Sequence, residues 1–332
     1  MRIVVIGATG HVGGYLVPRL VEAGHDVVAV SRGTQVRYRQ HVAWEKVTSV
    51  SIDRDQEELA GRFGERIADL NPDIVVDMVC FTRASAEHLV EAIRGRASLL
   101  VSCSSIWVHG TLSEVPADEE ADLEPWGEYG LGKLAMEQFL LDQSARPNGL
   151  PTVVLRPGHI SGPGWPAINP VGNLDVKVWE RLATGQPLTL PNLGLETLHH
   201  VHADDVAQAF ELAIAHHSEA AGEAFHVTSE RALTLRGFAT GVAGWFGRQA
   251  ELDFVPLAEF VRHSDGEQGL ISSDHVTRSH SVSIAKAQRL LRYRPRYTSL
   301  QAVAESVRSL NDSGRVRLAD GSLGGLTAPD GA

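Results

Sequence analysis

The 332-residue sequence predicts an α/β protein, with a doubly wound parallel sheet and a smaller, discontinuous C-terminal lobe. Two observations support this prediction. Short apolar runs alternate with helical patterns at close spacing through the first half of the chain, which is typical of βαβ units. The first of these runs leads directly into three regularly spaced glycines at the start of a predicted helix. The elements are justified below in chain order.

Residues 3–6 form an apolar run that is too short for a helix but suits a strand buried on both faces of a sheet. After it, Gly7 permits a tight turn, Gly10 lets the backbone approach a pyrophosphate, and Gly13 lets the helix pack close to the strand. The helix N-terminus offers N–H groups and partial positive charge to phosphates. A ligand-free strand-turn-helix is the alternative, but the context favours a dinucleotide site. We expect the other residues of the turn to contribute to it: Thr9, His11 and Val12.

A helix at 14–23 and a strand at 26–30 follow, and Arg32 stands just after that strand. An acidic side chain in this place holds the ribose 2′-hydroxyl of NAD, whereas an arginine accommodates the 2′-phosphate of NADP. Charge-assisted contacts from arginine suit a phosphate, although a solvated surface arginine is also common after a strand. We therefore favour NADP over NAD as the cofactor.

The alternation continues as far as residue 103. Further strands are predicted at 47–52, 74–79 and 99–103, and helices at 55–70 and 84–94. Together they predict a Rossmann-like parallel sheet, in which ligands lie at the carboxyl ends of the strands. This rule places Cys80, Phe81 and Ser104 on the same rim as the glycine turn. Asp53, at the exit of the third strand, either contacts the adenine side of a cofactor or caps the following helix.

Tyr129 and Lys133 are four residues apart at the start of a helix that extends to about residue 143, so their side chains share one face. A lysine ammonium near a phenol stabilises the phenolate and lowers a pKa that is ordinarily about 10. Such a tyrosine can exchange a proton with a substrate oxygen near neutral pH, and Ser105 could hold the same oxygen. Alone, the spacing is more typical of a pair on a helix surface. Combined with the glycine turn and the serine-ended strand, it indicates a catalytic site.

At this point the chain resembles the extended branch of the short-chain dehydrogenase/reductase family, which includes nucleotide-sugar epimerases and dehydratases. The resemblance covers about residues 1–300 and rests on the glycine turn, the tyrosine–lysine pair, Ser105 and an arginine–proline loop at 156–158. It implies that a nicotinamide exchanges hydride with a substrate carbon. It also implies that Tyr129 moves the proton on the attached oxygen, Lys133 holds the cofactor ribose, and Ser105 orients the oxygen. The loop would bring the backbone of Pro157 and Gly158 near the nicotinamide.

Several substrate-side residues depart from the family pattern. His109 replaces the usual tyrosine before a glycine, and His159 stands where sugar-nucleotide epimerases often carry asparagine. Ile106 follows Ser105, where dehydratases usually carry an acidic residue, so dehydration is disfavoured. We expect a polar carbonyl or hydroxyl compound as substrate, such as a nucleotide sugar. The candidate substrate-binding residues are Trp107, His159, Trp165, Asn173 and His200.

The residues leave several functions open. The chain could be an epimerase or dehydratase-like oxidoreductase, or an NADPH-dependent ketone reductase acting on a non-sugar molecule. A dinucleotide-sensing protein without chemistry is a further alternative, which the intact tyrosine, lysine and serine disfavour. The net charge of −11 argues against a nucleic-acid binder. The trio His199, His200 and His202 lacks a nearby cysteine or carboxylate in the same strand, so we expect no metal.

Composition changes after the sixth predicted strand, at 152–155, and this suggests two domains. Residues 1–156, with a returning segment at about 197–229, would bind the cofactor; 157–196 and 230–310 would form the substrate lobe; and 311–332 would form a flexible tail. Later elements are a strand at 224–228 and helices at 173–183, 203–217, 234–247, 256–262, 283–291 and 299–310.

The remaining features concern the cysteines and the location of the protein. Cys80 and Cys103 both lie in apolar runs and are expected to be buried free thiols. No apolar stretch approaches the roughly 18 residues of a membrane span, and no secretory leader is recognisable, so we expect a cytoplasmic protein. By analogy with the family, the helices at 84–94 and 129–143 could form a homodimer interface.

Overall fold

The structure is a computed structural model that describes residues 1–33, 37–263 and 266–318. Its largest sheet consists of β1 (Arg2–Ile6), β2 (Asp26–Ser31), β3 (Thr48–Ser51), β4 (Ile74–Asp77), β5 (Leu99–Cys103), β6 (Thr152–Pro157) and β11 (Ala224–Val227). These seven strands lie in the order β11-β6-β5-β4-β1-β2-β3, and every pair is parallel. The order reverses beside β1, so the predicted doubly wound sheet is confirmed.

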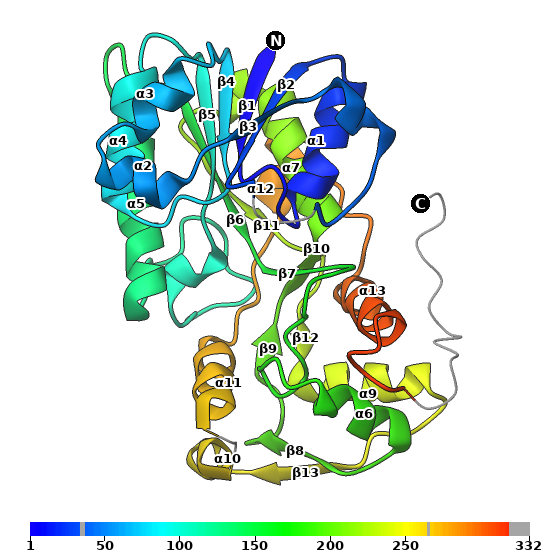
Figure 1. Ribbon diagram of the computed structural model, residues 1–332. Coiled ribbons are helices and arrows are strands. Elements are labelled where there is room, and N and C mark those ends of the chain that lie inside the picture. Colours follow the sequence, from blue (N-terminus) through cyan, green and yellow to red (C-terminus); the bar gives the residue numbers. More distant parts are fainter. Residues whose placement is uncertain (34–36, 264–265, 319–332) are drawn as a thin grey trace.

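Helices cover both faces of this sheet (Figure 1). One face carries α1 (Gly13–Glu22), α7 (Ala203–Ala215) and α12 (Ala285–Leu290); the other carries α2 (Arg54–Leu59), α3 (Phe63–Ala68), α4 (Arg83–Ile93) and α5 (Gly127–Ala145). Successive side chains of β1 lie on opposite faces of the sheet. Ile3 and Val5 pack under α1, while Val4 and Ile6 pack under α3 and α4. Burying each such side chain contributes about 1.5–3 kcal/mol.

Two predicted helices are shorter in the structure than in the sequence pattern. The helix expected at 55–70 is two helices, because Gly61 adopts a φ of +66° that ends α2. The helix expected at 173–183 begins later, as α6 (Lys177–Thr184). Asn173 Oδ1 accepts from the backbone N–H of Asp175 at 3.0 Å, and Asp175 Oδ1 accepts from that of Lys177 at 3.0 Å. These hydrogen bonds between side chains and the backbone take the place of the first turn of the predicted helix.

Below the large sheet in Figure 1 lies a smaller assembly of short elements. Its strands and those that link it to the sheet are β7 (His159–Ser161), β8 (Leu188–Pro191), β9 (Thr197–Leu198), β10 (His200–His202), β12 (Leu233–Thr234) and β13 (Leu252–Val255). They pair as β10–β7, β12–β9 and β13–β8. The helices are α6, α9 (Leu235–Trp245), α10 (Leu257–His263), α11 (Gly266–Arg278) and α13 (Ser299–Asp312), while α8 (His217–Ala220) follows α7.

This assembly has its own hydrophobic cluster, which includes Trp179, Phe238 and Val303 and is distinct from the two clusters against the large sheet. A separate core is what the predicted substrate lobe requires. The residue boundaries given for the two domains stay a prediction.

The predicted tail at 311–332 begins inside a packed segment. The last described helix, α13, extends to Asp312, and Val316 beyond it is 1% exposed. The backbone N–H of Leu318 donates to Asn311 Oδ1 at 3.2 Å. Residues 319–332 lie outside the described residues. Within the described part of the chain, none of the helices combines the length and apolar character needed to cross a bilayer.

Candidate active site

A cavity of about 860 Å³ opens at the carboxyl ends of β1, β4, β5 and β6. A second pocket of about 370 Å³ lies toward the end of β2. Both are lined by Gly7, Gly10, Arg32 and Phe81, so the two form one elongated space. This is the rim at which the sequence places a dinucleotide, and Thr9 lines its smaller pocket.

The glycine turn leaves several backbone N–H groups without partners. Gly7 has a φ of +87°, and a Cβ on Gly13 would lie 2.2 Å from the carbonyl oxygen of Ala8, so α1 packs directly on the turn. In the described part of the chain, the N–H groups of His11, Val12 and Gly13 form no backbone hydrogen bond. Three adjacent N–H groups at a helix N-terminus form a site for an anion such as a diphosphate.

Arg32 is the arginine placed at the cofactor end of the cavity. It lies just after β2, is exposed and lines both pockets. Two nearby arginines face other rings: the Arg37 guanidinium lies 4.4 Å from the Trp44 ring centroid, and that of Arg39 lies 4.7 Å from the Tyr15 ring centroid.

Asp53 and Cys80 lie outside the lining of both pockets. Asp53 Oδ1 accepts from the backbone N–H of Gln56 at 3.1 Å, so the carboxylate caps α2. The Cys80 thiol is buried and donates to the carbonyl oxygen of Thr82. Burial raises the pKa of this thiol to about 12. An acidic residue that the sequence reasoning missed, Asp55 on α2, lines the smaller pocket instead.

Lys133 is anchored where two central strands end. Its Nζ donates to the carbonyl oxygens of Cys80 and Cys103, each at 2.7 Å, and the side chain is buried. The ammonium lies 5.8 Å from the ring centroid of Tyr129, one turn earlier on α5. An ammonium has three N–H donors, and the two carbonyls use two of them.

Tyr129 also lines the cavity, and so does Ser105. Burial within the cleft raises the pKa of the phenol to about 12, although the residue is 44% exposed along the cavity; the neighbouring Ser105 hydroxyl acts in the opposite direction. The expectation that Lys133 lowers this pKa is therefore wrong for the protein without ligands. The main cause of the raised pKa is burial, and the ammonium donates to two carbonyl oxygens and not to the phenol.

Two serines at the end of β5 differ in their surroundings. Ser105 caps η2 (Ile106–His109), where its Oγ accepts from the backbone N–H of Trp107 at 3.2 Å. Ser104 Oγ is buried and has no hydrogen-bond partner among the described residues, yet Ser104 lines the cavity. A buried hydroxyl without a partner costs about 1–3 kcal/mol, and a polar group of a bound cofactor would relieve that cost.

The candidate substrate residues divide into those that line this cavity and those that do not. Trp107, His159 and Trp165 line it, as do Pro157 and Gly158 of the loop after β6. Asn173 and His200 do not, and Asn173 lines a separate pocket of about 750 Å³ together with Lys177 and Arg181. Asn173 Nδ2 donates to Ser272 Oγ at 2.9 Å, and His200 lies behind His159 with 5.4 Å between ring centroids.

Trp165 closes the loop after β6 onto the glycine turn. Its ring stacks on that of His11 at 5.3 Å with an interplanar angle of 8°. The sequence left open whether this tryptophan packs the loop or lines the pocket, and the structure shows that it does both.

Sequence reasoning missed most of the far wall of the cavity. His275 on α11 lies 5.0 Å from Trp107 and 5.2 Å from His159, measured between ring centroids. The other unpredicted lining residues are Tyr38, Met78, Val79, Cys103, Ile160, Pro166, Ile168 and Leu174. Predicting His275 as a residue of this cavity would have required a predicted helix at 266–278, and the apolar pattern of that segment is weak.

A buried polar network supports the site from behind η2. Arg156 on β6 forms an ion pair with Glu137 on α5 through its Nε, which lies 3.1 Å from both carboxylate oxygens. Arg156 Nη1 donates to the carbonyl oxygen of Glu119 at 3.0 Å and lies 3.4 Å from His109 Nε2. Because both charged groups are almost fully buried, each depends on the other for charge compensation.

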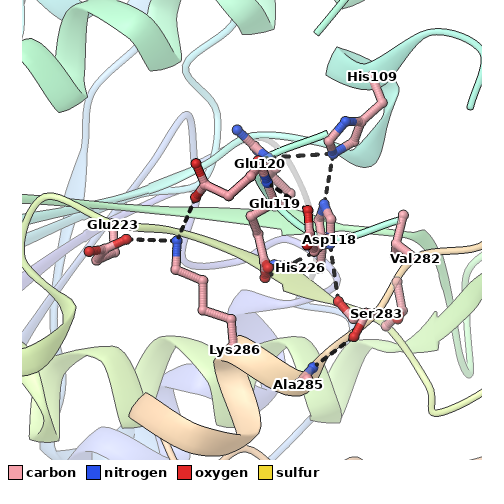
Figure 2. Close-up of polar contacts among 12 residues, drawn as sticks. His109, Asp118, Glu119, Glu120, Glu223, His226, Val282, Ser283, Ala285 and Lys286 are labelled. Atoms are coloured by element: carbon pink, nitrogen blue, oxygen red, sulfur yellow. Dashed lines mark hydrogen bonds and ion pairs between the residues drawn. The ribbon is translucent and has the colours of Figure 1, made fainter. Parts of the chain in front are cut away.

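The same network contains a pair of histidines (Figure 2). His109 Nε2 and His226 Nε2 lie 2.8 Å apart, while their Nδ1 atoms face the carbonyl oxygens of Asp122 and Ser283, each at 3.1 Å. Three hydrogen bonds need three N–H groups, but two neutral imidazoles carry two. The pair satisfies all three contacts only with one additional proton. Burial and the Arg156 charge lower the pKa of both rings, so that proton leaves as the pH rises.

Comparisons with known proteins agree with this geometry. The chain matches the model of the NAD dependent epimerase/dehydratase family over residues 3–228. It is 29% identical over 263 residues to 2'-dehydrokanamycin reductase of Streptomyces kanamyceticus, covering 77% of this chain and 70% of the relative. It is 27% identical over 277 residues to UDP-glucose 4-epimerase of Mycolicibacterium smegmatis, and this match covers 77% of this chain and 86% of the relative. The structure of UDP-glucose 4-epimerase from Thermotoga maritima, solved with UDP-glucose, is 20% identical to this chain. The match covers 94% of this chain and 99% of the epimerase chain with a TM-score of 0.70, which shows a shared fold.

Proposed function

Because the chain belongs to the NAD dependent epimerase/dehydratase family, we propose that it is an NADPH-dependent reductase of a small-molecule carbonyl, with Tyr129 as the proton donor. The observation that supports this direction most is the similarity to 2'-dehydrokanamycin reductase of Streptomyces kanamyceticus, 29% identical over 263 residues, and the protonated phenol is consistent with it. With a pKa of about 12, Tyr129 carries its proton at neutral pH and is ready to give it away. An oxidation or epimerisation would begin instead from a phenolate.

The cavity fits a dinucleotide. We assign its diphosphate to the N–H groups of His11, Val12 and Gly13, its polar carboxamide end to the region of Ser104, and a ribose hydroxyl to the third N–H donor of Lys133. A bound nicotinamide supplies the hydride. The residues of this chain bind and orient the cofactor and the substrate, and they move the proton.

In the proposed reduction, the substrate carbonyl oxygen lies against Ser105 and Tyr129. Hydride adds to the carbonyl carbon, the C=O π electrons move to oxygen, and Tyr129 gives that oxygen its proton to complete an alcohol. Ser105 holds the oxygen throughout, and the Lys133 ammonium offsets the phenolate charge until water returns a proton to Tyr129. Water elimination would need an acidic group beside Ser105, where the structure has the buried Ile106.

The NADP preference rests on Arg32 at the end of β2. A guanidinium can bind a 2′-phosphate through two parallel N–H donors, whereas a ribose 2′-hydroxyl gains little from it. The alternative cofactor is NAD.

An epimerase is the second candidate, favoured by the similarity to UDP-glucose 4-epimerase of M. smegmatis. The two are separated by incubating the protein with NADPH and a ketone. We expect one equivalent of NADPH to be consumed for each alcohol formed, followed by absorbance at 340 nm. Substrate turnover with no net change in NADPH would refute the reductase. A protein that binds NADPH but never turns over a carbonyl would be the sensor that the sequence also allows.

A further inference from the structure

Three aromatic side chains meet at the glycine turn and form part of the cavity wall there. Trp165, from the loop after β7, stacks on His11 with 5.3 Å between the ring centroids and 8° between the ring planes. Tyr38, from the segment after β2, lies 5.5 Å from His11 and 5.9 Å from Trp165, measured between centroids. All three residues line the cavity, and we call them the aromatic clamp.

The aromatic clamp leaves apolar surface open for a ligand to cover. Trp165 is 40% exposed and Tyr38 is 39% exposed, whereas His11 is 6% exposed. Exposed aromatic rings that line a cavity bury apolar area when a ligand lies against them. The backbone N–H of His11 belongs to the group to which the diphosphate of the cofactor is assigned above. In that assignment, the diphosphate is the ligand group next to the aromatic clamp.

The loop that carries the tryptophan is fastened to α13. Ser306 Oγ accepts from the backbone N–H of Gly162 at 2.6 Å and donates to the carbonyl oxygen of the same residue at 2.9 Å. Ser309 Oγ accepts from the backbone N–H of Gly164 at 2.9 Å. Val303 of the same helix packs in the hydrophobic cluster of the smaller assembly. The loop therefore connects the glycine turn of the large sheet to that assembly.

The rings of the aromatic clamp have two properties that favour a bound diphosphate. Water competes with backbone N–H groups for phosphate oxygens, and a site closed to water strengthens the N–H contacts. The indole of Trp165 and the phenol of Tyr38 each carry one hydrogen-bond donor, and neither donor has a partner among the described residues. Rings that cover the diphosphate would therefore exclude water and add donors.

Resting on the proposed NADPH-dependent reductase, we propose that the aromatic clamp covers the diphosphate of the bound cofactor and slows its release. Trp165 is the central residue of this cover, because it joins the glycine turn to the loop fastened on α13. The cofactor leaves when Trp165 separates from His11, so the contacts that hold the loop set the release rate. The hydride transfer itself does not involve these rings.

The test is stopped-flow displacement of NADPH by excess NADP⁺, followed by NADPH fluorescence, in the unaltered protein and in variants. Trp165→Ala removes the central ring of the aromatic clamp and should raise the release rate constant about tenfold. Trp165→Phe keeps a flat ring and loses the N–H donor, so a smaller increase is expected. Ser309→Ala removes the hydrogen bond to Gly164, outside the cavity, and should raise the rate constant about threefold.

Ser313→Ala is the matched control, because the Ser313 hydroxyl donates to the carbonyl oxygen of Leu310 at the end of α13. It should leave the release rate unchanged. An unchanged rate in Trp165→Ala, or equal rates in the two serine variants, would overturn the inference. A merely structural tryptophan would lower the free energy of unfolding in urea and leave the release rate unaltered.

Failure of the reductase function is distinguishable in the same experiment. A protein that binds NADPH and reduces no ketone would refute the proposed function, while its release rates would still test the aromatic clamp. An unaltered protein that binds no NADPH would overturn both.

Discussion

Acidification should destabilise this protein strongly, because several histidines are buried in neutral form. His11, His199, His200 and His280 are each at most 6% exposed, and burial is the main cause that lowers their pKa values to about 3, 4, 3 and 3. In the unfolded chain the same rings titrate near pH 6.5. Their contribution to stability is thus present above pH 6.5 and is lost as the pH falls toward their folded values.

The magnitude follows from proton linkage. Between pH 7.5 and 5.5, each ring that protonates only in the unfolded chain lowers the free energy of unfolding by about 1.3 kcal/mol, so four rings lower it by about 5 kcal/mol. Asp205 acts in the opposite sense, since burial raises its pKa to about 6, but it offsets less than about 1 kcal/mol over this interval. The net loss is comparable to the whole stability of many domains, about 5–15 kcal/mol.

Urea unfolding followed by tryptophan fluorescence at the two pH values measures this loss. The variant His280→Gln removes one titrating ring, and its loss on acidification should be smaller by about 1.3 kcal/mol. His217→Gln, on an exposed part of α8, is the control and should leave the loss unchanged. A free energy of unfolding that is the same at pH 7.5 and 5.5 would refute the reasoning.

Three further predictions concern single substitutions. Arg32→Ala should raise KM for NADPH by about 10- to 100-fold and leave KM for NADH within twofold, in steady-state assays with each cofactor; equal effects on both would contradict the 2′-phosphate contact. Gly13→Ala places a Cβ 2.2 Å from the Ala8 carbonyl oxygen, so the glycine turn must shift. The NADPH dissociation constant, measured by fluorescence titration, should then rise at least about tenfold. An unchanged dissociation constant would count against the turn as the diphosphate site. Glu137→Ala leaves Arg156 buried without its partner and should cost about 3–5 kcal/mol in urea unfolding, with a loss below about 1 kcal/mol as the contrary result.

Local patterns were enough to predict the sheet, the glycine turn and the tyrosine–lysine pair. Each depends on residues close together in sequence, where periodicity and turn chemistry act directly. Gly61 is an instructive failure: the apolar pattern on both sides of it is helical, but one residue in the left-handed region divides the helix. The two-residue strands β9 and β12 are too short to show alternation at all.

What could not be predicted depends on contacts between distant segments. One wall of the cavity brings His159 together with His275, 116 positions later in the printed sequence, and only the folded chain places their ring centroids 5.2 Å apart. The pKa of Tyr129 likewise depends on burial in the cleft and on where the Lys133 ammonium is anchored, and neither follows from the i, i+4 spacing.

The most direct test of the account is the variant Tyr129→Phe, measured for both NADPH binding and carbonyl reduction. Dihydroxyacetone and 2-hydroxycyclohexanone serve as phosphate-free ketone probes, with NADPH oxidation followed at 340 nm. If Tyr129 donates the proton, kcat should fall by about 10²- to 10⁴-fold while the NADPH dissociation constant stays within twofold of the unaltered protein. Retention of full turnover by the phenylalanine variant would contradict the central claim.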